Sequence, residues 1–308
     1  MTTTPNDFMA EGDPGQAQSL EQVGGSTTPD RWWQVVWSSK KARVGLVVLA
    51  LYVLMAVFAP LIAPHDPLDG GFTPLLQPSG EHWLGTNTNG RDIASQLIYG
   101  SRVSLLVGLF GGALATAIAL VVGMVSGYTE GTIVDDVLSF VTNVALVIPA
   151  LPLIITLVAY SDTRGVWLIV GIIALTSWAG AARSKRAQII TLRNRDFVTS
   201  AKFSGEGSAR IIFSEIMPNM SSLVVAGFVG AATGAVGAEA GLAVLGLGDT
   251  RSVSWGTMLY QADAQGAIQQ GLLTWIFAPG LALAILITAM SLINFGVDLL
   301  SNPHLRED

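Results

Sequence analysis

Six stretches of the chain are long, apolar and free of Asp, Glu, Lys and Arg. They cover residues 44–64, 103–129, 137–161, 165–182, 216–238 and 264–297, and the helical part of the last is expected to begin near Gly271. A membrane-spanning helix needs about 20 mostly apolar residues, because the hydrocarbon core is about 30 Å thick. A soluble core holds one or two such helices. The pattern therefore predicts an all-α polytopic membrane protein with six transmembrane helices.

The basic residues between these stretches predict the orientation. With the N-terminus in the cytoplasm, the inner segments hold twelve Lys and Arg and the outer segments hold four. Seven of the twelve lie in one long loop after residue 182. Because loops rich in Lys and Arg stay on the cytoplasmic side, both termini are expected in the cytoplasm.

The chain divides into four parts. Residues 1–39 are predicted to be a disordered polar tail that ends in an interfacial segment with Trp32, Trp33 and Trp37. Residues 40–101 contain the first span and an outer segment rich in Gly and Pro, and residues 102–300 contain a core of five helices. Within this core, residues 183–219 form the long inner loop, and residues 301–308 form a short C-terminal tail.

Composition narrows the possible chemistry. Hydrophobic residues make up 51% of the chain and charged residues 12%, and the net charge is −6. This balance argues against a nucleic-acid partner, which requires a concentrated basic surface. The chain has no Cys, and its three His (His65, His82 and His304) fall in loops that are far apart in the sequence. We therefore expect no metal site, no cofactor and no catalytic centre.

A nucleotide-binding P-loop is also absent. That motif requires a Lys directly after a Gly, and no Lys in this chain follows a Gly. The chain is therefore not expected to hydrolyse ATP. If it moves a solute against a gradient, the energy comes from an ion gradient or from a partner.

Four acidic residues lie at the edges of the apolar stretches: Asp135, Asp136, Glu239 and Asp298. Asp135 and Asp136 open the third stretch, where acids stabilise a helix N-terminus. Glu239 lies near the outer end of the fifth stretch. One interpretation is a carboxylate bonded to nearby backbone or facing a wet vestibule. The other is a residue of the solute pathway.

The inner loop contains two short amphipathic segments. Phe197, Val198 and Ala201 form one apolar stripe, and a second follows at residues 209–216. Gly205 and Gly207 separate the two segments, since Gly readily adopts a left-handed turn. The pattern predicts a helix-turn-helix under the membrane. It fits equally an interfacial helix that rests on lipid and a docking site for a cytoplasmic partner.

This loop resembles the EAA loop of ABC-importer permeases, whose helices dock in a groove of the ATPase subunit. The resemblance rests on Ala201, Gly205, Ile212 and the run Met217-Pro218-Asn219. Three positions depart from the family pattern. Thr199 replaces the family Glu, Ser200 replaces an Ala, and Glu215 stands where many relatives have His.

Other motifs resemble the dipeptide/oligopeptide/nickel permeases, of the dipeptide permease C type. They are His82-Trp83-Leu84-Gly85-Thr86, Gly90-Arg91-Asp92, the segments 99–105 and 238–248, Ser254-Trp255-Gly256 and Asn294-Phe295-Gly296. The resemblance covers roughly residues 40–308. It implies a type I ABC-importer permease fold in the bacterial cytoplasmic membrane, embedded in the lipid bilayer.

The same resemblance implies the partners. They are a homologous second permease that forms a heterodimer with this chain, two ABC ATPase subunits and an extracytoplasmic solute-binding protein. Peptides are the expected solutes. Oligosaccharides are the alternative, because residues 255–260 are similar to permeases of oligosaccharide importers and the preceding loop lacks a Pro-rich insert. A self-contained secondary transporter would show inverted repeats and buried ionisable pairs, and neither is visible in the sequence.

Overall fold

The structure is a computed structural model, and it describes residues 39–161, 165–249 and 251–301. Within these ranges every regular element is a helix, and one isolated bridge joins Thr86 to Asp92. The predictions for residues 1–38, for His304 and for the C-terminal tail beyond residue 301 lie outside the described residues. The helices are α3 (Lys40–Val57), α4 (Ala59–Ile62), α5 (Ile93–Tyr128), α6 (Ile133–Val147), α7 (Ala150–Ala159), α8 (Val166–Leu192), α9 (Asp196–Phe203), α10 (Ser208–Arg210), the π-helical η1 (Ile211–Ile216), α11 (Met217–Asn219), α12 (Ser221–Val244), α13 (Trp255–Ala264) and α14 (Leu273–Ser301).

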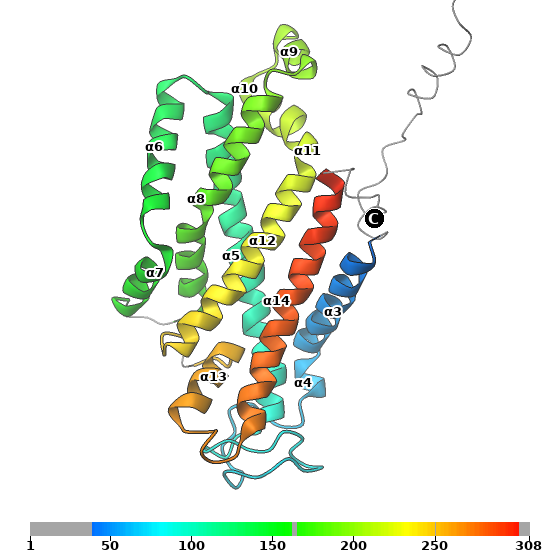
Figure 1. Cartoon of the computed structure of the whole chain (residues 1–308), viewed down its shortest axis with the longest axis vertical. Helices are drawn as coiled ribbons and strands as arrows, with labels where there is room; N and C mark the ends of the chain where they lie inside the picture. The colour runs from blue at the N-terminus through cyan, green and yellow to red at the C-terminus, as the bar shows by residue number, and fades with distance from the viewer. Residues whose placement is uncertain (1–38, 162–164, 250, 302–308) are drawn as a thin grey trace, which may run out of the picture.

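The long helices run roughly side by side (Figure 1). One end of the bundle carries α9, α10, η1 and α11, and we call it the α9 end. The opposite end carries α13 and the irregular residues 63–92, and we call it the α13 end. The start of α3 and the end of α14 both point toward the α9 end (Figure 1).

Among the described residues, four helices are long and apolar enough to cross a membrane: α5, α8, α12 and α14. They coincide with four of the six uncharged stretches, so the sequence prediction is confirmed at these places. Helices α6 and α7 pass the same test only as a bent pair, which gives five spans if the pair is counted as one. Helix α3 is not among them, since its 18 residues begin with Lys40, Lys41 and Arg43.

The third stretch is not the single straight helix that the uncharged pattern suggests. Helices α6 and α7 meet at an angle of 83°. Pro149 stands at the junction, and Ile148 before it has an extended backbone with ψ of 122°. A residue before proline is sterically pushed out of the helical region, which explains the break.

Close helix packing inside the chain depends on small residues of α5. A Cβ on Gly112 would lie 2.6 Å from the backbone of Ala232 in α12, and one on Gly123 would lie 2.5 Å from the carbonyl oxygen of Ala182 in α8. Small residues let two backbones approach within a membrane, where packing drives helix association. Helix α5 is therefore the central helix against which α8 and α12 pack.

Helix α12 also carries glycines that contact no other described helix or loop. Gly230, Gly234, Gly237 and Gly241 are exposed, and no described atom lies within 4 Å of a Cβ built on any of them. Their spacing of three and four residues places them on one face of the helix. We call this face the α12 glycine face.

Two of the histidines expected to be far apart lie together at the α13 end. The ring centroids of His65 and His82 are 4.9 Å apart. The irregular chain between α4 and α5 folds back on itself and closes the 17-residue gap in the sequence, which spacing alone does not reveal.

Candidate functional site

Helix α9 ends in a turn that requires glycine. Gly205 has φ of +79°, a backbone conformation that other residues adopt at a cost. Its N–H donates to the Lys202 carbonyl at 3.0 Å, and the Glu206 N–H donates to the Ala201 carbonyl at 3.2 Å. This pair of bonds is the Schellman motif, and it redirects the chain sharply after α9. Gly207, two residues on, has an ordinary φ of −71°.

The chain then returns to the bundle through α10, η1 and α11. Pro218 lies in the first turn of α11 and has no N–H to donate to the preceding turn. Helix η1, whose π-helical turns are wider than α-helical turns, ends at Ile216, directly before α11. The Asn219 side chain donates to the Glu215 carbonyl at 2.6 Å, so Glu215 and Asn219 are linked across this junction.

An apolar cluster holds these short helices against the bundle. Its buried members from the loop are Val198, Ile211, Ile212, Ile216 and Met220, and they pack on Met124 of α5 and Ile189 of α8. Ala201 packs against the same cluster. The loop therefore rests on the ends of α5 and α8, and its position is coupled to theirs.

The remaining predicted loop residues face outward. Thr199, Ser200, Gly205, Pro218 and Asn219 are exposed, whereas Glu215 is half-buried. Phe203, at the end of α9, is 88% exposed. The structure thus separates an inner set, Ala201 and Ile212, which packs on the bundle, from an outer set that is exposed at the α9 end.

Beneath the loop, α5, α6 and α8 are joined by a polar network. Arg186 of α8 forms two hydrogen bonds with Asp135 of α6, at 2.8 and 2.7 Å. The hydroxyls of Ser126 and Ser139 donate to the same carboxylate at 2.6 and 2.9 Å. A cavity of about 260 Å³ lies beside it, lined in part by Arg183 and Asn143. Sequence reasoning assigned Asp135 only to a helix N-terminus and missed its partner 51 residues away.

Glu239 lies within α12, and its side chain is 2% exposed. Its Oε2 makes no hydrogen bond with any described residue. The neighbouring residue Ala240 packs against Gly256 at the start of α13. Glu239 therefore faces the interior of the chain, on a different side of α12 from the exposed Gly237 and Gly241.

Comparison with known proteins identifies the family. Residues 119–307 match the family described as "Binding-protein-dependent transport system inner membrane component", and residues 30–78 match the "N-terminal TM domain of oligopeptide transport permease C".

Curated relatives align over most of their own length as well. The dipeptide transport system permease protein DppC of Bacillus subtilis (strain 168) is 30% identical over 94% of this chain and 90% of its own. The oligopeptide transport system permease protein OppC of the same organism is 33% identical over 72% of each chain. DppC of Haemophilus influenzae is 30% identical over 91% of this chain and 96% of its own. The chain belongs to the family of inner membrane components of binding-protein-dependent transport systems.

Proposed function

We propose that this chain is one transmembrane subunit of an ATP-driven importer of short peptides, in a bacterial cytoplasmic membrane. The observation that carries the proposal is the similarity to relatives named as dipeptide and oligopeptide permeases, which extends over 94% of the chain in one case. The chain forms half of the translocation path, and ATP hydrolysis belongs to partner subunits.

The proposed membrane topology has six spans. Helices α3 and α4 together form the first, and the bent pair α6–α7 forms the third. Support comes from the exposed apolar residues along α3, such as Val47 and Leu54, which suit a lipid environment. Helix α3 also packs closely on α14, where Gly296 meets Ala42 and the Tyr52 hydroxyl donates to the Ala282 carbonyl at 3.1 Å.

In this topology the α9 end lies in the cytoplasm, together with both termini. The sequence argument is the excess of Lys and Arg in the segments at this end. The α13 end, with residues 63–92 and α13, then lies outside the membrane. It is the proposed docking surface for the solute-binding protein.

The second permease is proposed to pack on the α12 glycine face. A helix face without side chains lets another helix approach closely, and in a membrane such approach drives association. The path would run between the two subunits. Glu239 remains a proposed residue of the translocation path. Because its side chain is buried within this chain, we place it behind the α12 glycine face, where it would support the wall of the path.

The loop from α9 to α11 is proposed to dock on an ATPase subunit and to act as its coupling helix-turn-helix. The residues assigned to this contact are Thr199, Ser200, Ala201, Gly205, Ile212, Glu215, Pro218 and Asn219. Closure of the ATPase pair on ATP would move the loop. Because Val198 and Ile212 pack on α5 and α8, the motion would reach the spans as rigid-body movement and give alternating access.

Uptake in a strain that lacks the chromosomal copy of this gene tests the proposed function. We expect the restored gene to support uptake of a labelled dipeptide or oligopeptide, and not of a labelled oligosaccharide. An ATPase-inactive partner should abolish this uptake, which separates an ATP-driven importer from a secondary transporter. Restored oligosaccharide uptake without peptide uptake would contradict the proposed substrate class and leave the family assignment intact.

A further inference from the structure

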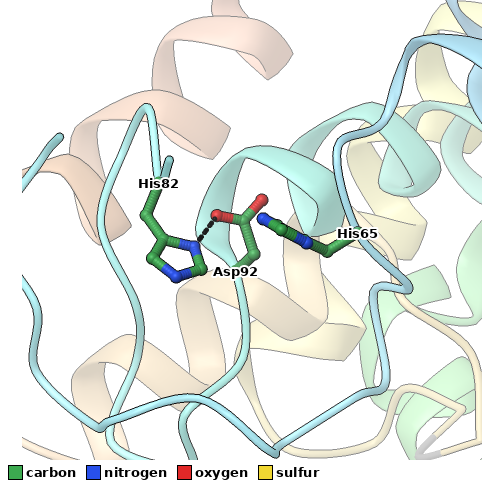
Figure 2. Close-up of side chains that lie close together, drawn as sticks. All are labelled: His65, His82 and Asp92. Carbon is green, nitrogen blue, oxygen red and sulfur yellow. Dashed lines mark hydrogen bonds and ion pairs between the residues drawn. The ribbon is translucent and has the colours of Figure 1, made fainter. Parts of the chain in front are cut away.

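Three potential metal ligands converge at the α13 end. His65 follows α4, His82 lies in the irregular segment, and Asp92 caps the N-terminus of α5. Each offers a ligand atom, and these atoms all lie within 4.8 Å of one another. Figure 2 shows the Asp92 carboxylate between the two imidazole rings. His82 Nδ1 donates to Asp92 Oδ1 at 2.9 Å.

The surrounding contacts hold these side chains in place. Asp92 Oδ2 accepts hydrogen bonds from the Ser95 N–H and from the Ser95 hydroxyl, both at 2.7 Å, which leaves Oδ1 for His82. Ser95 Oγ also accepts the N–H of His65 at 3.0 Å. Phe72 packs on both imidazoles, with centroid distances of 4.6 Å to His65 and 4.7 Å to His82. In metal sites the ligands are typically oriented by outer contacts of this kind.

The charge of the cluster favours a cation. Asp92 is 0% exposed and His82 is 3% exposed, so the carboxylate is removed from water. Among the described residues the one ion-pair partner of Asp92 is His82, which carries a charge only when it is protonated, and no Lys or Arg pairs with this carboxylate. A buried carboxylate is costly unless it is paired or coordinates a metal. His65 is only partly buried, so a cation can reach the cluster from the solvent at its side.

We propose that His65, His82 and Asp92 bind a divalent transition-metal ion, with Zn²⁺ as the preferred occupant. The ligands would be one imidazole nitrogen of His65, Nδ1 of His82 and Oδ1 of Asp92, with the fourth position open to water. Two nitrogens and one carboxylate oxygen suit Zn²⁺, at bond lengths of about 2.0–2.2 Å. Zn²⁺ takes the place of the proton that His82 Nδ1 donates to Asp92, and this proton moves through solvent to Nε2, so the imidazole ring stays neutral.

Such bond lengths require ligand atoms to lie about 3.3 Å apart in a tetrahedral site. Nδ1 of His82 and Oδ1 of Asp92 are already close to that separation. The half-exposed His65 is the residue that must move inward. The ion would fasten the chain between α4 and α5 to the first turn of α5, and so fix the outer surface of the subunit. This inference stands independently of the solute that the transporter carries.

The test uses the full chain, purified in detergent without a polyhistidine tag. Zn²⁺ binding is measured by competition with a chromophoric chelator, and Co²⁺ is used as a spectroscopic probe of the ligands. Wild type is compared with His65→Gln and with His304→Gln. The latter is a matched control because it removes the chain's remaining histidine. His65→Gln removes the 3.3 Å contact of His65 Nε2 with the Glu81 carbonyl but leaves the hydrogen bond between His82 and Asp92 intact, so one side-chain anchor of the loop remains.

We expect one Zn²⁺ per chain in wild type and in His304→Gln, with a raised thermal unfolding midpoint when Zn²⁺ is present. Removing the His65 ligand should weaken Zn²⁺ binding by at least about 10-fold and abolish the visible Co²⁺ absorption. Equal affinity in wild type and His65→Gln would overturn the proposal, as would the absence of binding in wild type. In the first case His65 is not a ligand, and in the second His82 and Asp92 form only a structural hydrogen bond.

Discussion

Arg186 on α8 holds Asp135 on α6 through a pair of parallel hydrogen bonds, from Nε to Oδ1 at 2.8 Å and from Nη2 to Oδ2 at 2.7 Å. Bidentate pairs of this kind are the strongest and most directional of ion pairs. The pair joins the first turn of α6 to the part of α8 that leads into α9. Its location at the α9 end, close to the loop, sets it apart from the buried charges at mid-membrane that mark ion relays.

Loss of this pair should destabilise the α9 end. In Asp135→Asn the Arg186 guanidinium loses its anionic partner while it remains largely covered, at 31% side-chain exposure. We expect a loss of about 2 kcal/mol in the free energy of unfolding, because a partly buried charge is left unpaired. A thermal unfolding curve of the purified chain measures the change. Asp136→Asn is the matched control, since Asp136 is exposed and should leave the midpoint unchanged. Equal unfolding midpoints for the two variants would contradict a stabilising role of the pair between Arg186 and Asp135.

The turn at Gly205 gives a second prediction. A β-branched side chain at φ of +79° is strained by about 1 kcal/mol or more, so Gly205→Val should change the direction in which the chain leaves α9. We expect the subunit to insert normally while peptide uptake falls relative to ATP hydrolysis by the assembled complex. Uptake and ATPase activity are measured on the same membrane vesicles.

Gly207→Val is the control for this substitution. It has the same volume change two residues away, at a φ of −71° that Val adopts without strain. Uptake should stay near the wild-type level in this variant. Normal uptake together with normal ATPase copurification in Gly205→Val would show that the turn has no role in coupling.

Phe203 gives a third prediction. A phenylalanine that is 88% exposed at the last residue of α9 suits an interface with a partner. Phe203→Ala should reduce copurification of the ATPase and leave the thermal unfolding midpoint of the isolated chain unchanged. Val198→Ala is the contrasting variant, because Val198 is buried on the inner side of α9 and not exposed to a partner. That variant should lower the midpoint, by an amount corresponding to about 1–3 kcal/mol. If Phe203→Ala retains full copurification, the α9 tip is not the docking surface.

The α12 glycine face gives a fourth prediction. Gly234→Leu places a large side chain where no described atom lies within 4 Å, so the chain itself should fold unchanged. The added side chain should nevertheless obstruct a second subunit that packs on this face. We expect reduced recovery of the second permease with this variant in a pull-down from detergent-solubilised membranes. Gly171→Leu on α8 is the control, since a Cβ there also has no described neighbour within 4 Å. Equal recovery with both variants would place the second permease elsewhere.

The sequence located most of the membrane helices because absence of charge is a local property of a segment. The uncharged stretches chosen on that basis overlap α5, α8, α12 and α14. The bend between α6 and α7 was also visible in principle, since Pro149 stands inside the third stretch and restricts Ile148 before it. A search for stretches without charged residues does not take proline into account. It therefore predicted one helix where the structure has α6 and α7.

The polar clusters could not be predicted in this way, because they depend on tertiary contacts. Asp135 and Arg186 are 51 residues apart and meet only when α6 packs on α8. His65, His82 and Asp92 are brought together by an irregular segment without periodicity.

The sequence also placed Glu239 at the edge of a span, whereas α12 continues to Val244 and buries its side chain. A carboxylate in an apolar run signals an unusual environment, but not the direction in which it points.

Topology gives the last prediction, and the natural sequence makes it simple to test. The chain contains no Cys, so a single introduced cysteine is the only thiol. Ser79 lies among the irregular residues at the α13 end and Ser208 lies at the α9 end, and both are exposed. If the α9 end is cytoplasmic, an impermeant thiol reagent should label Ser79→Cys in intact cells and label Ser208→Cys only after the membrane is opened. The excess of Lys and Arg at the α9 end is the physical reason for this expectation. Labelling of Ser208→Cys but not of Ser79→Cys in intact cells would invert the orientation, and it would exclude an ATPase contact at α9.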